Sequence, residues 1–505
     1  MAQSRSKNSI LNAISAMALT LVNGLLGVVV TGMVIDKFGS DFNGINSTVN
    51  QIVNMLLILE GGFTVASNVS LFAPLTQGDF TLVNGILSAT LKKFRKIALL
   101  FLGIGAAVSV AFGFLANSEL NVEFIITVVL MAVVPAAFNL FYATTYRVLL
   151  QTQQKEYIIS FITMLTIGGG HLANIVMMSF GGPMWAVRFI TMAFAFLNSL
   201  LIATYVKRKN KFINFKIAPK GEMIKGTKDV MVQKITGVIY NSFPIIFLTV
   251  SPAGGTVLAS IYAVYNQVFV LIKSLLHAAI DAPRLSFGQM LTERKREDVW
   301  HTFKVYEFIA FFAVFMLLST TFALILPFVK IYTAGADANY YDPIIALLMV
   351  LVAVVEMIHI PSGHLLNMAG KFKISKNFQL IACGALIVTM LIGGGIYGVY
   401  GMLGALLLCA VILAVLEMGY VHLCFFKGKL FELIKLMAPF VIVGIALCYA
   451  ESLLPVTING YLQFGIYGVV FMVVNTLVAL IIGLVFNKNI TVSLIKRVKG
   501  MLIRK

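Results

Sequence analysis

Apolar residues in this chain gather into long stretches that are separated by short polar segments, from the first residues to the last. About 20 consecutive apolar residues are enough to cross the hydrocarbon core of a bilayer as an α-helix. By this criterion the pattern predicts an all-α polytopic membrane protein with about fourteen transmembrane helices. The predicted helices are residues 11–35, 44–75, 97–115, 124–149, 158–179, 184–206, 235–251, 256–282, 307–328, 343–369, 376–396, 400–425, 435–453 and 461–486.

The composition agrees with this class and excludes several others. Of the 505 residues, 59% are hydrophobic and only 11% are charged. Soluble domains are usually about a quarter charged. Too few charged residues remain to cover the surface of a soluble enzyme, a nucleic-acid-binding module or a disordered chain. The four cysteines all lie within apolar stretches and are expected to be packing residues.

Basic residues are distributed unevenly between the two sides of the predicted membrane. With the N-terminus inside, two of the 38 Lys and Arg residues fall in outer loops, Lys37 and Lys330. A few more lie within or at the ends of spans, and the remainder lie in inner loops and tails. Because cytoplasmic loops carry such an excess, both termini are predicted to be cytoplasmic. The net charge of +18 then requires no nucleic-acid partner.

An internal repeat divides the chain. Asn50-Gln51 matches Asn266-Gln267 at an offset of 216 residues, and Leu149-Leu150 with Lys155 matches Leu365-Leu366 with Lys371 at the same offset. The repeat predicts two pseudo-symmetric six-helix lobes around a central lumen, at 1–206 and 235–426. Between them, 207–234 is a basic cytoplasmic linker that is expected to lie on anionic headgroups. Two extra transmembrane helices and a basic tail occupy 427–505.

One face of the predicted helix 256–282 is polar and cationic. Four residues on it are separated by 7, 4 and 7 positions, which places them within about 20° of one line. They are Asn266, Lys273, His277 and Arg284. Charged groups in mid-span usually face a cavity or a partner, so this face is expected to be a cavity wall that meets an anionic substrate. Arg284 either belongs to it or reaches the inner headgroups, and Asp281 is expected to pair with His277 or Arg284.

The repeat mate of this helix, 44–75, carries neutral polar groups along one face. Asn46 and Asn50 are expected to line the lumen beside Asn266. Glu60 is isolated in an apolar stretch. It either titrates in an ion-coupling step or forms an ion pair with a basic residue.

Two arginines lie near opposite ends of their spans. Arg147 ends the fourth span and Arg188 begins the sixth. With Lys273 they form a ladder of cations at three depths that would attract an anion, unless both arginines are interfacial anchors. Glu356 with His359, and Glu417 with His422, are either proton-linked pairs or structural hydrogen bonds. Glu60, Asp281 and Glu356 are the candidates for ion coupling, and His171 is expected to be a core histidine.

Two kinds of motif are missing from the sequence. No glycine loop is followed by the Lys and Ser/Thr of a phosphate-binding loop, and no cluster has metal-ligand spacing. The sequence therefore predicts neither a cofactor nor a metal site.

Several segments resemble the multidrug/oligosaccharidyl-lipid/polysaccharide exporter superfamily, and within it the Wzx-type flippases of capsule or exopolysaccharide clusters. They are Gly44-Ile45-Asn46, Leu59-Glu60-Gly61-Gly62, Leu71-Phe72-Ala73-Pro74-Leu75, Arg147-Val148-Leu149-Leu150-Gln151 and Ile261-Tyr262-Ala263-Val264-Tyr265. The resemblance implies alternating access by two lobes. It also implies a substrate, an undecaprenyl-diphosphate type lipid-linked oligosaccharide that is moved from the inner to the outer leaflet.

Other functions stay open at this stage. A drug/cation antiporter of the same superfamily would favour acidic binding residues, and a lipid II flippase is a closer cousin of the expected flippase. A membrane enzyme would need a large outer loop, whereas the outer loops here are short, so the chain is not expected to be an enzyme. A monomer that works beside a polysaccharide polymerase is expected.

Overall fold

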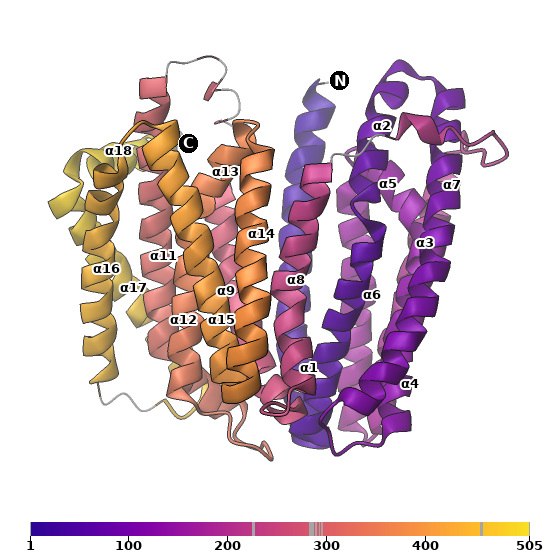
Figure 1. Cartoon of the computed structure of the whole chain (residues 1–505), viewed down its shortest axis with the longest axis horizontal. Helices are drawn as coiled ribbons and strands as arrows, with labels where there is room; N and C mark the ends of the chain where they lie inside the picture. The colour runs from indigo at the N-terminus through magenta and orange to yellow at the C-terminus, as the bar shows by residue number, and fades with distance from the viewer. Residues whose placement is uncertain are drawn as a thin grey trace. The chain divides into compact units, whose positions relative to one another are not determined.

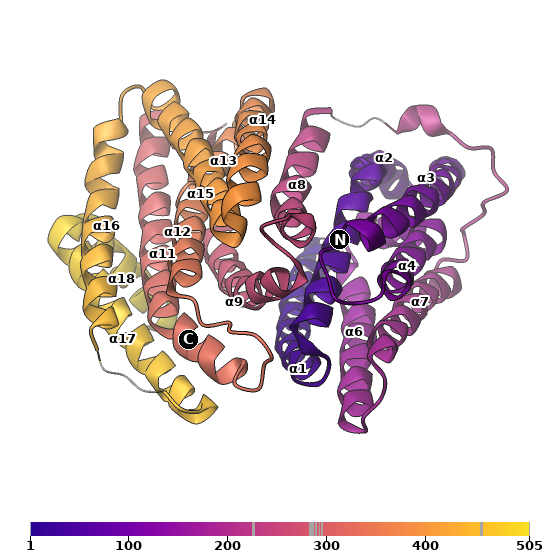
Figure 2. The ribbon, with the colours of Figure 1, turned by 60° about the horizontal axis from the view of Figure 1, so that its bottom comes forward.

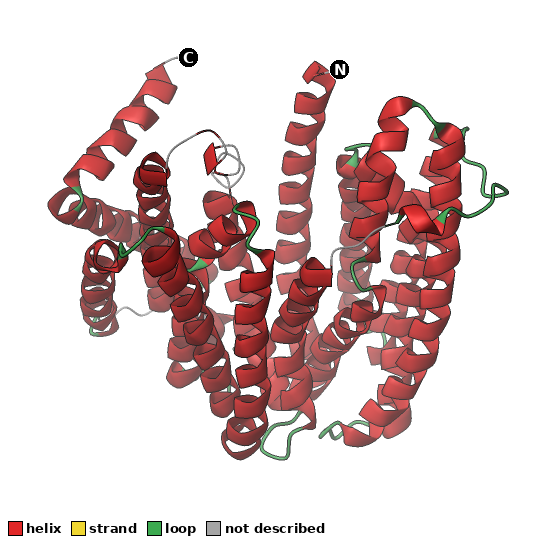
Figure 3. Cartoon of the chain, turned by 45° about the horizontal axis from the view of Figure 1, so that its top comes forward, coloured by secondary structure: helices red, strands yellow, loops and turns green. Residues whose placement is uncertain are grey.

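A computed structural model describes residues 2–224, 228–281, 296–454 and 458–503, together with residues 287, 290, 291 and 293. Every regular element in these residues is helical, as Figure 3 shows. The chain divides into two compact units, and each is described by itself. The N-terminal unit comprises Met1–Ala263 and Gly335–Ala338, and the C-terminal unit comprises Val264–Ala334 and Asn339–Lys505.

The N-terminal unit contains eight helices and the beginning of a ninth (Figure 1). They are α1 (Ala2–Leu56), α2 (Phe63–Gln77), α3 (Phe80–Leu115), α4 (Val122–Phe138), α5 (Thr144–Thr152), α6 (Glu156–Ser179), α7 (Met184–Lys209), α8 (Lys228–Val250) and α9 (Thr256–Asp281). Short 3₁₀-helices follow α1 and α7, and a π-helical turn, Asn139–Ala143, joins α4 to α5. Helices α1, α6 and α7 lie side by side, as do α3 and α4 (Figure 2).

The C-terminal unit continues from α9 with further helices. They are α11 (Arg296–Tyr332), α12 (Pro343–Ile358), α13 (Ile360–Met368), α14 (Phe372–Thr389), α15 (Gly395–Tyr420), α16 (Leu430–Ser452), α17 (Tyr461–Phe486) and α18 (Lys488–Ile503). Two π-helical turns, Met390–Gly394 and Val421–Phe425, interrupt this series. Buried phenylalanines fill the interior of each unit, for example Phe94 in the first and Phe308 in the second.

The membrane-spanning helices agree with the hydropathy pattern. Twelve stretches of the described chain are long and apolar enough to cross a bilayer. Two of them, Ile10–Glu60 and Phe372–Phe425, have 51 and 54 residues, about twice the length of one crossing. Each contains a glycine with positive φ, Gly39 at 85° and Gly398 at 56°, where two helices meet. The described residues therefore hold fourteen crossings in two units, as the sequence predicts.

Two predicted boundaries were wrong for a local reason. The span expected at 44–75 is interrupted, because Gly61 and Gly62 have left-handed φ values and end one helix before α2 begins. The span expected at 97–115 is the second half of a longer helix. Asp79 caps the start of α3 by accepting a hydrogen bond from the backbone N–H of Leu82 at 2.9 Å, so the helix extends beyond the apolar stretch.

The backbone repeats at the offset found in the sequence. Gly39 and Gly255, which are 216 residues apart, have φ values of 85° and 127° and precede the helices that carry Asn50 and Asn266. Gln154 and Gly370, at the same offset, have φ values of 58° and 70°. The adjoining backbone hydrogen bonds also match. The N–H of Lys155 donates to Leu150 O and the N–H of Lys371 to Leu366 O, each at 2.9 Å. The two units therefore share local structure as well as sequence.

Candidate substrate cavity in the N-terminal unit

The N-terminal unit contains a cavity of about 580 Å³. Its lining comes from α1, α4, α5, α6, α7 and the π-helical turn, and it includes two arginines, Arg147 and Arg188. The other side chains with hydrogen-bonding groups are Asn23, Asn50, Asn54, Asn139, Thr163, His171, Asn174, Thr191, Asn198 and Ser199. No aspartate, glutamate or lysine is among the described residues that line it. The cavity therefore combines hydrogen-bonding groups with apolar surface, and its described lining carries only positive formal charge.

Two neighbouring helices each present one face to this cavity. On α6 the lining residues include Thr163, and His171 and Asn174 follow it 8 and 11 positions later. The residues of α7 include Arg188, followed by lining residues 3, 4, 7, 10 and 11 positions later. Such spacings keep side chains on one side of an α-helix. One side of each helix, with polar and apolar side chains, thus builds a wall of the cavity.

The π-helical turn brings Arg147 into the cavity. Asn139 and Arg147 are eight residues apart, and a regular α-helix would place them about 80° apart around its axis. A π-turn accommodates one extra residue, which reduces the difference to about 20°. Both side chains accordingly line the same cavity.

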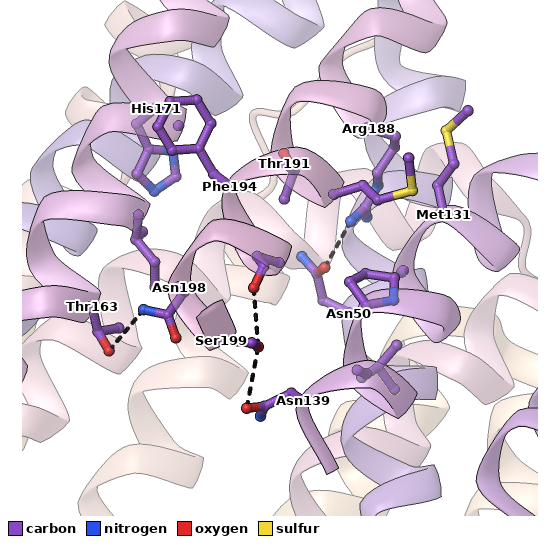
Figure 4. Close-up of a pocket in the computed structure, with 18 of the residues that line it drawn as sticks. Asn50, Met131, Asn139, Thr163, His171, Arg188, Thr191, Phe194, Asn198 and Ser199 are labelled. Carbon is purple, nitrogen blue, oxygen red and sulfur yellow. Dashed lines mark hydrogen bonds between the residues drawn. The ribbon is translucent and has the colours of Figure 1, made fainter. Parts of the chain in front are cut away.

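Arg188 is buried at the start of α7, with 4% of its surface exposed. One of its terminal nitrogens, Nη1, donates to Asn50 Oδ1 at 2.9 Å, and Nη2 donates to the backbone carbonyl of Asn46. Figure 4 shows Arg188 and Asn50 pointing toward one another. The Nε–H of Arg188 has no hydrogen-bond partner within the described part of the chain. Two neutral groups of α1 therefore hold this guanidinium.

Arg147 is held in the same way by a different amide. Its Nη2 donates to Asn198 Oδ1, and its Nε–H is also unpartnered among the described residues. The Nδ2 of Asn198 donates in turn to Thr166 Oγ1 at 2.8 Å and to Thr163 Oγ1 at 3.2 Å (Figure 4 shows the latter). This chain of hydrogen bonds fixes the amide so that its oxygen faces the arginine.

Neither arginine is neutralised by the residues that the structure describes. No carboxylate in those residues lies within 4.0 Å of Arg147 or Arg188. A charge within a transmembrane segment costs about 2.5–3.5 kcal/mol on insertion scales, and it is usually paired or faces a polar cavity. Here the second condition holds. The cavity can therefore bind an anion through guanidinium N–H groups, with amides and hydroxyls available for neutral polar groups of the same ligand.

Sequence reasoning singled out Arg147, Arg188 and Asn50 but missed most of the neutral lining. His171, expected to be a core histidine, contacts Asn23 Oδ1 through Nε2 at 3.0 Å and also lines the cavity. Asn198 was not considered. Polar residues that recur on one side of each helix, at 3, 10 and 11 positions after Arg188 on α7 and at 8 and 11 positions after Thr163 on α6, are the signal that would have found these positions.

The residues of the predicted cationic face on α9 lie elsewhere. Helix α9 is continuous, so Asn266, Lys273 and His277 share one side of it. Lys273 Nζ is 3.1 Å from Glu356 Oε2 on α12, in the C-terminal unit. His277 Nδ1 is 3.8 Å from Asp281 Oδ2, as one of the two expected pairings has it. Arg284 lies outside the described residues.

Glu60 has partners at the start of α2. Its Oε2 is 3.5 Å from Lys234 Nζ, and its Oε1 accepts the backbone N–H of Thr64 at 3.1 Å. A carboxylate at this position also favours the helix N-terminus electrostatically. Of the two roles proposed for Glu60, the structure supplies a partner for the ion pair, and ion coupling stays a prediction.

Two further histidine–carboxylate pairs in the C-terminal unit form between helices. His359 Nδ1 is 2.9 Å from Glu417 Oε2, and His422 Nε2 is 3.1 Å from Glu307 Oε2. The spacing suggested Glu356 for His359 and Glu417 for His422, whereas the structure places a carboxylate of another helix against each histidine, and a proton-linked role stays a prediction. Proximity along one helix allows such a pair but does not exclude a better partner on a neighbouring helix.

Solved structures of membrane transporters share this fold. A multidrug resistance MATE family transporter of the MOP superfamily in an inward-facing conformation is 15% identical, with a TM-score of 0.63, and the match covers 85% of this chain and 98% of that one. The lipid II flippase MurJ in an inward closed conformation is 12% identical, with a TM-score of 0.66, over 95% of this chain and 99% of that one. An outward-facing MATE family transporter is 12% identical, with a TM-score of 0.52, over 88% and 96%.

No protein-family model matches the sequence, and a search of curated proteins gives no match. At identities of 12 to 15% the structural likeness establishes the fold alone. The chain is thus a multi-pass membrane protein with the two-lobed fold of MATE transporters and of MurJ. Its substrate has to be argued from the chemistry of the cavity.

Proposed function

We propose that the chain is a flippase that moves a polyprenyl-diphosphate-linked oligosaccharide from the inner to the outer leaflet of a bacterial cell membrane by alternating access. The physical problem is a large polar headgroup with two phosphates, which cannot cross about 30 Å of hydrocarbon unaided. A polar cavity with fixed positive charge replaces water around that headgroup, while the lipid chain stays in the bilayer. Export of capsule or exopolysaccharide precursors is the process that such a substrate serves.

The observation that carries the proposal is the pair of arginines without carboxylate partners. Arg147 and Arg188 keep guanidinium N–H groups that amides only partly occupy. A guanidinium binds phosphate oxygens with two parallel hydrogen bonds, which suits a diphosphate. The surrounding asparagine, threonine and serine side chains offer both donors and acceptors, which suits sugar hydroxyls.

The same observation separates this proposal from a drug/cation antiporter. A cationic drug would meet two uncompensated positive charges in this cavity and no carboxylate among its described lining residues. The fold does not choose between the two functions, since both MATE transporters and MurJ have it. The likeness to MurJ extends over more of the chain, 95% against 85%, which supports a lipid-linked substrate. A lipid II flippase stays an alternative within the same chemistry.

The distribution of basic residues supports the proposed orientation. Lys and Arg are concentrated in the loops and tails on the side of the N-terminus, so both termini are proposed to be cytoplasmic. An undecaprenyl-diphosphate type donor is made on that side, and a polysaccharide polymerase on the other would consume the flipped product. A monomer is proposed, since the candidate cavity is complete within one unit of one chain.

A headgroup-access assay tests the proposal. Purified protein is placed in liposomes with a labelled polyprenyl-diphosphate oligosaccharide, and accessibility of the headgroup from outside is followed over time. We expect the wild type to exchange headgroups between leaflets. Arg188→Gln and Arg147→Gln should each slow the exchange by about 10–100-fold, because each removes charge-assisted hydrogen bonds worth about 1.5–3 kcal/mol. Arg208→Gln, at the exposed end of α7, is the matched control and should leave the rate unchanged.

Two outcomes would contradict the proposal in different ways. Exchange at the wild-type rate by the Arg147→Gln/Arg188→Gln double variant would keep the flippase class but reject this cavity as its site. Absence of exchange by the wild type, with or without an imposed ion gradient, would reject the flippase. Uptake of a cationic dye in the same liposomes would then favour the antiporter.

A further inference from the structure

A second pocket, separate from the cavity that holds Arg147 and Arg188, lies against α3 in the N-terminal unit. It has a volume of about 410 Å³ and combines four cations with an apolar wall. The cations are Lys92, Arg95, Lys96 and Lys216, and the apolar residues are Leu91, Leu99, Phe215, Ile217, Ala218 and Pro219, with Ser88 beside them. No acidic residue is among its described lining residues. The transport proposal makes no use of this pocket.

One wall of the pocket is the segment 211–220, which follows α7 and is fastened across α3. The side-chain amide of the buried Asn84 holds this segment through both its nitrogen and its oxygen. Its Nδ2 donates to Phe212 O at 2.8 Å, and its Oδ1 accepts the backbone N–H of Asn214 at 2.9 Å. The N–H of Lys220 donates to Gly85 O at 3.0 Å, and the rings of Phe80 and Phe212 are 4.6 Å apart. The wall is therefore a built part of the unit.

Ser88 supplies the second feature of a binding site. Only 6% of this residue is exposed, and its Oγ has no hydrogen-bond partner among the residues that the structure describes. Serine hydroxyls in transmembrane helices usually donate to a backbone carbonyl one turn earlier, as Ser109 does to Gly105 O at 2.7 Å on the same helix. A buried hydroxyl without a partner costs free energy unless a ligand satisfies it.

The polar and apolar parts of the pocket are ordered along the helix axis as the parts of a phospholipid are. Leu99, 64% exposed, lies within the apolar stretch at 97–115, and the basic residues from Arg95 to Lys92 lie just outside that stretch. Lys92 is about 6 Å from Lys96 along the axis at 1.5 Å per residue, and Ser88 is one turn beyond Lys92. The headgroup layer of a bilayer is about 5–8 Å thick on each side. Arg95 is also held in place, since its Cζ is 4.9 Å from the ring centre of Phe141.

We infer that this pocket binds one anionic phospholipid whose headgroup carries a hydroxyl, with phosphatidylglycerol as the defining chemistry. The acyl chains lie against Leu99 and Ile217, and the phosphodiester lies among Lys92, Arg95 and Lys96. The hydroxyl of the headgroup accepts a hydrogen bond from Ser88 Oγ. A bound lipid of this kind would fix the 211–220 segment to α3 through contacts that the protein alone lacks.

Native mass spectrometry of the full-length protein tests this site. Protein from nanodiscs of phosphatidylglycerol and phosphatidylcholine in equal amounts is released, and the retained lipid is counted. We expect one phosphatidylglycerol per chain. The Lys92→Gln/Arg95→Gln/Lys96→Gln variant should retain about 100-fold less lipid, since each of the three basic residues near a membrane surface contributes about fivefold to the attraction of anionic lipid. Ser88→Ala should lower retention by a smaller factor and leave the charge unchanged.

The controls separate a specific site from general attraction and from phosphate binding. Lys155→Gln/Arg208→Gln/Lys209→Gln removes the same number of charges from exposed positions outside the pocket and the 211–220 segment, and should retain the lipid. Equal losses in both triple variants, or equal retention of phosphatidylcholine by the wild type, would overturn the inference. Displacement of the lipid by inorganic phosphate would overturn it as well, because the site would then select free phosphate. None of these readouts depends on transport activity.

Discussion

The two arginines that line the cavity of the N-terminal unit and the basic residues within the C-terminal unit are held by different means. In the N-terminal unit, Arg147 and Arg188 contact amide and backbone carbonyl oxygens, which are neutral. In the C-terminal unit, Lys273 contacts the carboxylate of Glu356, and His422 contacts that of Glu307. A cation that is paired with a carboxylate attracts an anionic ligand only weakly, because the two charges largely cancel. A cation that is held by neutral groups keeps most of its electrostatic attraction for such a ligand.

This difference assigns distinct tasks to two sets of residues that look alike in the sequence. Compensated pairs such as Lys273–Glu356 connect helices and hold the C-terminal unit together. Uncompensated arginines reduce the stability of the apo protein, and proteins usually retain such features at functional sites. The three predictions below alter one side of this comparison at a time.

The largest effect is expected from giving Arg147 a carboxylate partner. Asn198→Asp replaces the amide that accepts the hydrogen bond of Arg147 by a carboxylate of the same shape. It turns the arrangement of the N-terminal unit into that of the C-terminal unit. We expect headgroup exchange in liposomes to fall by about 10–100-fold, because the guanidinium is neutralised, while thermal stability is unchanged or higher.

Asn339→Asp is the matched control for this experiment. Asn339 is exposed, and its Oδ1 accepts the backbone N–H of Tyr341 at 3.0 Å, which an aspartate can also accept. Exchange should stay at the wild-type rate. If Asn198→Asp exchanged headgroups as fast as Asn339→Asp, the field of Arg147 would have no role in transport.

An intermediate effect is expected when one partner of a compensated pair is removed. Lys273→Gln leaves Glu356 without its cation, and the side chains are 21% and 12% exposed. We expect the free energy of unfolding to fall by about 1–3 kcal/mol, less than for a fully buried pair. The double variant Lys273→Gln/Glu356→Gln should recover most of the lost free energy of unfolding. Arg188→Gln should not lower it comparably, since no carboxylate is left without its cation.

Thermal unfolding of the purified variants in one detergent measures this difference, and the headgroup-access assay completes it. The double variant is expected to transport close to the wild-type rate. If the double variant had normal stability but still lost transport, Lys273 would belong to the anion-binding site, as the polar face of its helix predicts.

The smallest effect concerns a turn that both units share. Gln154 and Gly370 occupy equivalent positions with φ values of 58° and 70°, where glycine is favoured by roughly 1 kcal/mol. Gln154→Gly should therefore stabilise the protein slightly, and Gly370→Ala should destabilise it by about the same amount. Gly103→Ala, in the middle of α3 with open space around it, is a control that should not destabilise. If both turn variants changed the free energy of unfolding in the same direction, the shared left-handed backbone conformation would not set these preferences.

Hydropathy predicted the crossings well because the need to satisfy backbone groups in lipid leaves few alternatives to a helix. It also predicted that Lys273 and His277 share a face, since α9 has no interruption. It could not predict the partner of Lys273. Glu356 lies on another helix, and periodicity describes one helix at a time.

The π-helical turn, which places Asn139 and Arg147 in the same cavity, could not be predicted from the sequence for a related reason. Eight residues separate Asn139 from Arg147, and regular helical geometry assigns them to different faces. Nothing in the local sequence marks the extra residue of the turn. The neutral lining residues, such as Asn198, were missed by the sequence reasoning. Inserting an asparagine or threonine into a membrane costs much less free energy than inserting a charge, so these residues are a weaker sign of a functional site.

The asparagine partners of the arginines also have a consequence for turnover. An amide oxygen that accepts from a guanidinium can be displaced by a phosphate oxygen and can return when the phosphate leaves. Asn50 and Asn198 are placed to make this exchange with Arg188 and Arg147. In the proposed flippase, a phosphate oxygen would replace an amide oxygen at each arginine, so only the difference between the two acceptors would appear as affinity. Such an exchange would keep the net affinity for the headgroup low and so allow its release on the other side of the membrane.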